Sequence, residues 1–142
     1  MRKYLSLLLA GSLVLPPPGS AGQSAANQQQ GTPVRSKKKN PYIGKVLEGV
    51  GSYYGEAFRG KKTHSDEVFD PDKLTAACNV LPLRTWVKVT NLRNHRSVRL
   101  WINDRMHPKN KRLIDVSARA ARELGFYARG LTRVRVEVIA PP

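Results

Sequence analysis

The tripeptide Asn103-Asp104-Arg105 contains the residue best suited to acid–base chemistry in this chain. It follows an alternating stretch, residues 98–102, whose apolar side chains share one face because side chains alternate with period two along a strand. The same parity places Asp104 on the apolar side, with Asn103 and Arg105 on the opposite face. Burial favours the protonated form of a carboxyl group, which a general acid needs near neutral pH. The alternative is a structural carboxylate that accepts hydrogen bonds from local backbone N–H groups.

Three other residues that could take part in chemistry precede this tripeptide. Residues 55–72 are rich in Gly, Lys, Asp and Ser, and they predict a long loop of the kind that is usually functional in a small domain. This loop supplies His64 and a second carboxylate, Glu67. Cys78 is the only cysteine, so it is either a buried thiol or a reactive one, and a buried thiol is the commoner case. The Cys and His residues lack zinc-site spacing, so we expect no metal and no cofactor.

The chain of 142 residues has room for one domain with tails. Its 25 basic and 10 acidic residues give a net charge of +15. Such a charge favours anionic partners, namely nucleic acid, acidic lipid or an anionic cell-wall polymer. A basic surface without a dedicated polyanionic partner is the alternative.

Residues 1–21 have the organisation of a secretory signal peptide. Two basic residues, Arg2 and Lys3, precede an apolar run that ends at three prolines, and small residues follow. The run is shorter than the roughly 20 residues of a membrane span, so we expect cleavage and no transmembrane segment thereafter. No cysteine directly follows the run, which predicts that the protein is not a lipoprotein. We expect an exported protein of the periplasm or cell envelope, without a nucleic-acid partner.

Residues 22–41 predict a flexible basic linker. They include glutamines at 28–30 and lysines at 37–39, with too few large apolar side chains to offset the entropy lost on ordering. The folded domain is predicted over residues 42–142.

The folded part has the pattern of a small β-barrel, whose closure removes exposed strand edges. Ser117 can cap a helix over residues 118–124, and Gly125 suits the left-handed conformation that ends one. The strand candidates are residues 46–54, 86–90, 97–103, 113–116 and 131–139, with a short apolar segment at 74–80 and a hairpin turn at 91–96.

Eight short motifs, spread over roughly residues 49–138, come in the order seen in the rare lipoprotein A (RlpA) family, which this chain therefore resembles. The motifs are Gly51-Ser52-Tyr53-Tyr54-Gly55, Phe58-Arg59-Gly60-Lys61-Lys62-Thr63, Glu67-Val68-Phe69-Asp70, Leu74-Thr75-Ala76-Ala77, Leu81-Pro82-Leu83, Val87-Lys88-Val89-Thr90-Asn91-Leu92, Asn103-Asp104-Arg105 and Ile114-Asp115-Val116-Ser117. Any one of them alone would be weak, whereas eight in register are specific.

The resemblance implies a mainly β fold, a small six-stranded double-psi β-barrel with one or two short helices. It also implies an endolytic peptidoglycan lytic transglycosylase that cleaves MurNAc–GlcNAc bonds of glycan strands and leaves 1,6-anhydroMurNAc ends. The family's acidic positions correspond to Asp104 and Glu67, the expected catalytic residues. The expected substrate-binding residues are Tyr53, Tyr54, Phe58, Arg105 and Cys78. Trp101 could add to a sugar-stacking surface.

Two positions depart from the family's pattern. Asp66 stands where a glycine usually precedes the glutamate, and Cys78 stands where the family has an active-site histidine. His64 is a candidate to substitute for that histidine.

Three hypotheses follow. The first is the transglycosylase, with Asp104 as the acid–base group; Glu67 would stabilise oxocarbenium-like charge, orient the sugar or, in a hydrolase, activate water. The second is a non-catalytic, expansin-like glycan-binding barrel, which the Cys78 replacement favours. The third is a basic scaffold that recruits envelope or divisome proteins.

Overall fold

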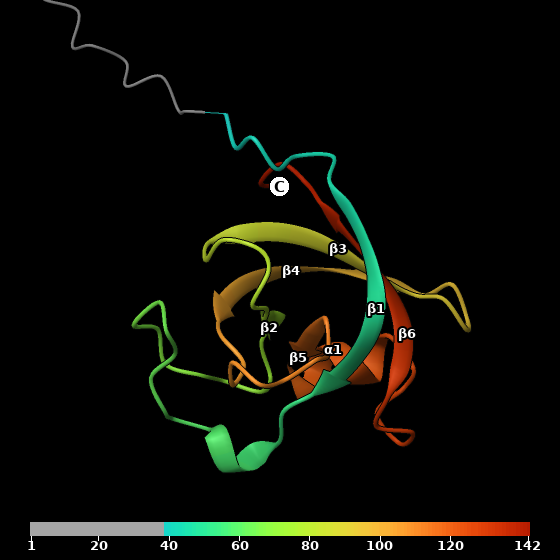
Figure 1. Cartoon of the computed structure of the whole chain (residues 1–142). Coiled ribbons are helices and arrows are strands. Elements are labelled where there is room, and N and C mark those ends of the chain that lie inside the picture. The colour runs from blue at the N-terminus through green and yellow to red at the C-terminus, as the bar shows by residue number, and fades with distance from the viewer. Residues whose placement is uncertain (1–38) are drawn as a thin grey trace, which may run out of the picture. The chain divides into compact units, whose positions relative to one another are not determined.

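A computed structural model describes residues 39–142, which contain a closed barrel of six strands (Figure 1). The strands are β1 (Val46–Tyr53), β2 (Thr75–Ala77), β3 (Thr85–Asn91), β4 (Ser97–Asp104), β5 (Ile114–Val116) and β6 (Thr132–Val138), and the helical elements are η1 (Glu56–Phe58) and α1 (Ala118–Glu123). The predicted mainly β, six-stranded barrel with short helices is confirmed. The predicted signal peptide and almost all of the predicted linker lie outside the described residues.

The strands follow one another around the barrel in the order β1, β5, β2, β4, β3 and β6. Two neighbouring pairs, β1 with β5 and β2 with β4, are parallel, and the other pairs are antiparallel. Parallel neighbours need long crossover connections. The loop that joins β1 to β2 is also long, although these two strands pair with β5 and not with each other, and it carries Glu67 and His64.

The alternation predicted for β3 and β6 is confirmed by burial. Val87 and Val89 of β3 face the interior and are fully buried, while Lys88 between them is exposed. Val134 and Val136 of β6 do the same on the neighbouring strand. Together with α1, these strands form one packed apolar core, which holds the ends of the strands in place.

The predicted boundaries of α1 are confirmed to within one residue. The Ser117 hydroxyl accepts a hydrogen bond from the Ala120 N–H at 3.3 Å, which satisfies one of the free N–H groups of the first turn. Gly125 adopts a φ of +75° just after the helix, the left-handed conformation that glycine tolerates best.

The end of β4 departs from the period-two pattern. Ala76 of β2 pairs with Ile102, but the next residue, Ala77, pairs with Asp104, so Asn103 is the extra residue of a β-bulge. The parity prediction is therefore wrong at this point. Asn103, expected opposite the apolar face, is only 2% exposed, and Asp104, expected on the apolar side, keeps 21% of its side chain exposed.

The close packing of β1 leads to a stability prediction. A Cβ atom at Gly49 would lie 2.9 Å from the Leu113 Cβ, whereas a Cβ atom at Gly55 would meet nothing within 4 Å. We expect Gly49→Ala to lower the free energy of unfolding by about 1–3 kcal/mol through overpacking. The control, Gly55→Ala, should change it by less than about 0.5 kcal/mol. Urea denaturation of both variants measures the difference, and equal effects would contradict this account of the packing.

Candidate active site

The loop at residues 55–72 folds back onto the end of β4, beside which it is visible in green in Figure 1. The Ser65 N–H donates to the Asn103 carbonyl oxygen at 3.1 Å, which ties the loop to the bulge. Within the loop, the Thr63 N–H donates to the Glu67 carbonyl oxygen at 2.8 Å. These bonds give the loop one defined path along β4, so its polar side chains have fixed positions.

Asp66 adopts a φ of +64° at the turn of this loop. That left-handed conformation suits glycine best, and aspartate is one of the few other residues that adopt it without a large penalty. The departure from the family's usual glycine at this position is therefore compatible with the loop's backbone.

Asp104 has two carboxyl oxygens in different environments. Its Oδ1 atom accepts hydrogen bonds from the Arg105 N–H at 2.8 Å and the His64 N–H at 3.1 Å, and it lies 2.8 Å from the His64 Nδ1 atom. Among the described residues, no donor contacts Oδ2. The surroundings of Asp104 are thus rich in donors on one side, rather than apolar as the sequence pattern suggested, and the second oxygen is available to a ligand.

Asp104 lines a cavity of about 250 Å³ at this end of the barrel. The Tyr54 ring forms part of its wall and packs against Phe69, with 4.2 Å between ring centroids, and edge-on against Phe58 at 6.0 Å. Burial raises the pKa of the Tyr54 hydroxyl, and the Asp104 carboxylate adds to the effect, so this phenol remains protonated. The cavity therefore offers aromatic surface next to the carboxyl group, whereas the neutral Tyr54 hydroxyl is itself buried.

Glu67 is held by both of its oxygens. Oε1 accepts from the Trp101 indole N–H at 3.0 Å, and Oε2 accepts from the Asn103 side-chain amide at 2.9 Å. Burial pulls the pKa of Glu67 upward, but hydrogen bonds from Asn103, Trp101 and Ser65, with the charge of Arg84, outweigh it and lower the pKa. Glu67 is therefore an ionised brace for the end of β4.

A second cavity, of about 460 Å³, lies on the Glu67 side of β4. Trp86 and Trp101 contribute aromatic surface to it, with ring centroids 5.3 Å apart, and Lys73, Arg99 and Arg119 contribute positive charge. Sequence reasoning missed Trp86 as a candidate site residue. The signal was present in the predicted hairpin, because its register pairs Trp86 directly with Trp101.

Of the remaining predicted site residues, Arg105 lies at the Asp104 cavity, whereas Cys78 and Tyr53 do not line it. Arg105 lines the Asp104 cavity with Tyr54 and Phe58, but its guanidinium donates to the carbonyl oxygens of Cys78 and Leu81. Cys78 itself is a free thiol, 0% exposed, in the apolar core, so of the two alternatives for this residue the buried one holds.

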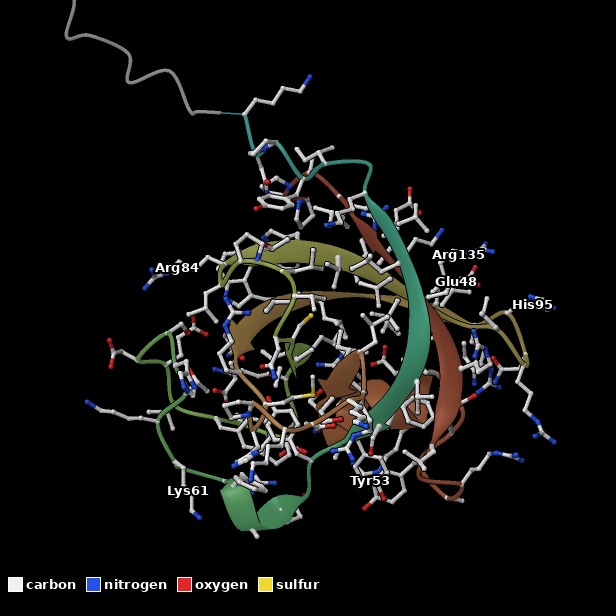
Figure 2. The ribbon with its side chains drawn as sticks, viewed as in Figure 1. Glu48, Tyr53, Lys61, Arg84, His95 and Arg135 are labelled. Carbon is white, nitrogen blue, oxygen red and sulfur yellow. The ribbon has the colours of Figure 1, made fainter. Side chains whose placement is uncertain are left out.

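Tyr53 lies apart from both carboxylates. It is stacked on Tyr127 with ring centroids 4.6 Å apart, near α1 (Figure 2), and it lines neither cavity. The structure thus brings Asp104, Tyr54, Phe58 and Arg105 together around one cavity, and Glu67 lines the other cavity.

Over residues 39–142, no three His, Cys, Asp or Glu side chains group as metal ligands, and no helix has the length and apolar character of a membrane span.

The fold and the site define a class: a closed double-psi β-barrel with two carboxylates and aromatic walls at the end of one strand. The sequence model of the family described as "Lytic transglycolase" matches residues 46–136. The chain belongs to this RlpA-like double-psi β-barrel family.

Curated relatives agree with this assignment. A protein of Campylobacter jejuni named endolytic peptidoglycan transglycosylase RlpA is 44% identical over 97 residues, which are 68% of this chain and 35% of the relative. A Haemophilus influenzae protein of the same name is 41% identical over 110 residues, 78% of this chain and 38% of the relative. The chain thus spans little more than a third of the length of these relatives.

Solved structures show the same fold at low sequence identity. The Streptomyces papain inhibitor superposes with a TM-score of 0.57 at 21% identity, covering 69% of this chain and 97% of the inhibitor. An expansin from Clavibacter michiganensis, in complex with cellohexaose, superposes with a TM-score of 0.55 at 17% identity, covering 68% of this chain and 52% of the expansin.

The lowered pKa of Glu67 predicts how stability depends on pH. A carboxylate whose pKa is lower in the folded state stabilises the fold above its ordinary value of 4.5, and this contribution is lost as pH falls through the folded-state pKa. We expect Glu67→Gln to lower the free energy of unfolding at pH 7 by about 1 kcal/mol and to reduce its decline between pH 6 and pH 3.

Urea denaturation as a function of pH measures this effect. Glu123→Gln is the matched control, because Glu123 forms an exposed pair with Arg119 that contributes little to stability. The account of Glu67 as an ionised brace fails if the two variants behave alike across this pH range.

Proposed function

We propose that this protein is an endolytic peptidoglycan lytic transglycosylase, which cleaves MurNAc–GlcNAc bonds and leaves 1,6-anhydroMurNAc ends. The observation that carries the proposal is the asymmetry of Asp104: one oxygen is held by fixed donors and the other is free beside an aromatic-walled cavity. Family membership and the names of the relatives support the same reaction.

Asp104 is the acid and then the base of this reaction. Protonated on its free oxygen, it donates the proton to the glycosidic oxygen as the bond to MurNAc C1 breaks and GlcNAc departs. The resulting carboxylate accepts the proton of the MurNAc 6-hydroxyl, whose oxygen bonds to C1 and closes the anhydro ring. One carboxyl group is sufficient, because the nucleophile belongs to the substrate and no water is consumed.

Glu67 supports this reaction as a permanent negative charge. Its lowered pKa makes it a poor proton donor, and both of its oxygens already accept hydrogen bonds. A carboxylate so engaged is poorly placed to activate water, which favours the transglycosylase over the two-carboxylate hydrolase. We assign it to holding Trp101 and Asn103 and to stabilising the oxocarbenium-like charge near C1.

The two cavities suit a glycan strand that lies across the end of β4. Tyr54 and Phe58 would contact sugar on the Asp104 side, and Trp86 and Trp101 would stack on sugar on the Glu67 side. The positive charges around the second cavity suit the anionic groups of peptidoglycan.

Export to the periplasm or cell envelope is part of the proposal. The N-terminal sequence supports it through the signal-peptide pattern of residues 1–21, followed by a basic linker over residues 22–41. Envelope or divisome proteins remain candidate partners on the basis of the basic charge alone.

A second candidate function is glycan binding without cleavage. Cys78 supports it, because the family's histidine position is here a buried thiol. The backbone N–H bonds to Asp104 are also those expected of a structural carboxylate.

Incubation of purified glycan strands with the protein, followed by mass spectrometry, tests the proposal. The wild type should form anhydro ends, and Asp104→Asn should lower the rate by about 10²–10⁴-fold because the proton donor is lost. The control is Asp72→Asn, which changes an exposed aspartate at the end of the loop at residues 55–72 and should preserve the rate.

Other products distinguish the alternatives. Ordinary reducing ends would identify a hydrolase, and binding to sacculi with no cleavage by the wild type would identify a glycan-binding barrel. Full activity of Asp104→Asn would remove Asp104 from the mechanism.

A further inference from the structure

The His64 imidazole lies on Asp104 although the two residues are 40 positions apart in the chain. Its Nδ1 atom is 2.8 Å from Asp104 Oδ1, and its backbone N–H donates to the same oxygen at 3.1 Å. The ring is otherwise 63% exposed, so burial does not force it into this position. A residue that contacts one oxygen through both its backbone and its ring controls how that carboxyl group is oriented.

We propose that His64 is a positioning residue, which acts through Asp104 by holding Oδ1 and thereby leaving Oδ2 as the oxygen that carries the transferred proton. This inference rests on the proposed transglycosylase function.

The chemistry follows from the hydrogen bonds at Oδ1. In a protonated carboxyl group one oxygen is a hydroxyl and the other is a carbonyl acceptor. A hydroxyl at Oδ1 would place its proton among the N–H groups of His64 and Arg105, so the geometry favours the carbonyl there. A neutral His64 ring with its proton on Nδ1 adds a third donor to the same oxygen. After proton transfer, these donors stabilise the carboxylate that must then accept a proton.

The loop holds His64 in place before any substrate binds. On one side of it the Thr63 N–H bonds to the Glu67 carbonyl oxygen, and on the other the Ser65 N–H bonds to the Asn103 carbonyl oxygen. These bonds have already ordered the backbone, so the pairing with Asp104 costs mainly the rotamer freedom of one ring.

Kinetics of three variants test the role of the ring. His64→Ala keeps the backbone N–H but removes the imidazole, and His64→Asn places an amide nitrogen where Nδ1 stood. The control is His95→Asn, which removes an imidazole at the tip of the β3–β4 hairpin, across the barrel from the loop that carries Lys61 (Figure 2). Full-length protein is assayed for formation of anhydro ends at several glycan concentrations.

We expect His64→Ala to lower kcat by about 10–100-fold, with KM changed by less than about 3-fold, because the ring orients the reacting group without binding substrate. His64→Asn should recover most of this loss, and His95→Asn should match the wild type. Melting temperatures of all variants should agree closely. A kcat for His64→Ala within 2-fold of the wild type, or no recovery in His64→Asn, would overturn the proposal.

Nitrogen NMR of the His64 ring separates this inference from the proposed function. Even if the wild type forms no anhydro ends, the ring should carry its proton on Nδ1. In Asp104→Ala, which lacks the acceptor, it should return to the Nε2–H tautomer that a neutral histidine side chain prefers in water. An Nε2–H tautomer in the wild type, or no change in Asp104→Ala, would overturn the positioning role.

Discussion

The attachment of the β1–β2 loop to the bulged end of β4 is the constraint on which the candidate site depends. Asn103 is the central residue: its carbonyl oxygen accepts the Ser65 N–H, and its side-chain amide donates to Glu67. Asn103 is almost fully buried, so loss of these bonds would leave polar groups without partners and away from water. This attachment positions both Glu67 and His64, and the bulge itself orients Asp104.

The two carboxylates at the end of β4, Glu67 and Asp104, lie in different environments. Glu67 is saturated by an indole and an amide and has a lowered pKa, whereas Asp104 has one engaged and one free oxygen. Carboxyl groups with contrasting surroundings commonly have contrasting roles in acid–base sites. In the proposed reaction, this contrast assigns structural support and negative charge to Glu67 and proton transfer to Asp104.

Much of the fold was predictable from local patterns. The strict alternation of Val134, Val136 and Val138 identified β6, and Ser117 with Gly125 identified the start and end of α1. Such features depend on neighbouring residues alone, so a single sequence is enough to detect them. The order of the motifs likewise indicated the barrel and the family before any contact was known.

The positions of Cys78 and Tyr53 were not predictable in this way. Tyr53 lies in a motif shared with the family and Cys78 directly follows one, yet the Cys78 side chain is buried in the core and the Tyr53 ring stacks near α1. Which wall of a barrel a side chain occupies depends on packing between elements that are distant in the chain.

The sequence by itself determined the barrel and its family and indicated two candidate carboxylates, because alternation, turn residues and short motifs can be recognised along the chain without knowledge of tertiary contacts. Only the tertiary structure decided the surroundings of Asp104. The bulge at Asn103 arises from the pairing of β4 with β2, which is distant in the chain, and it overrides the alternation that parity assumes. The contact between His64 and Asp104 has the same origin, because it exists only once the loop has folded onto β4.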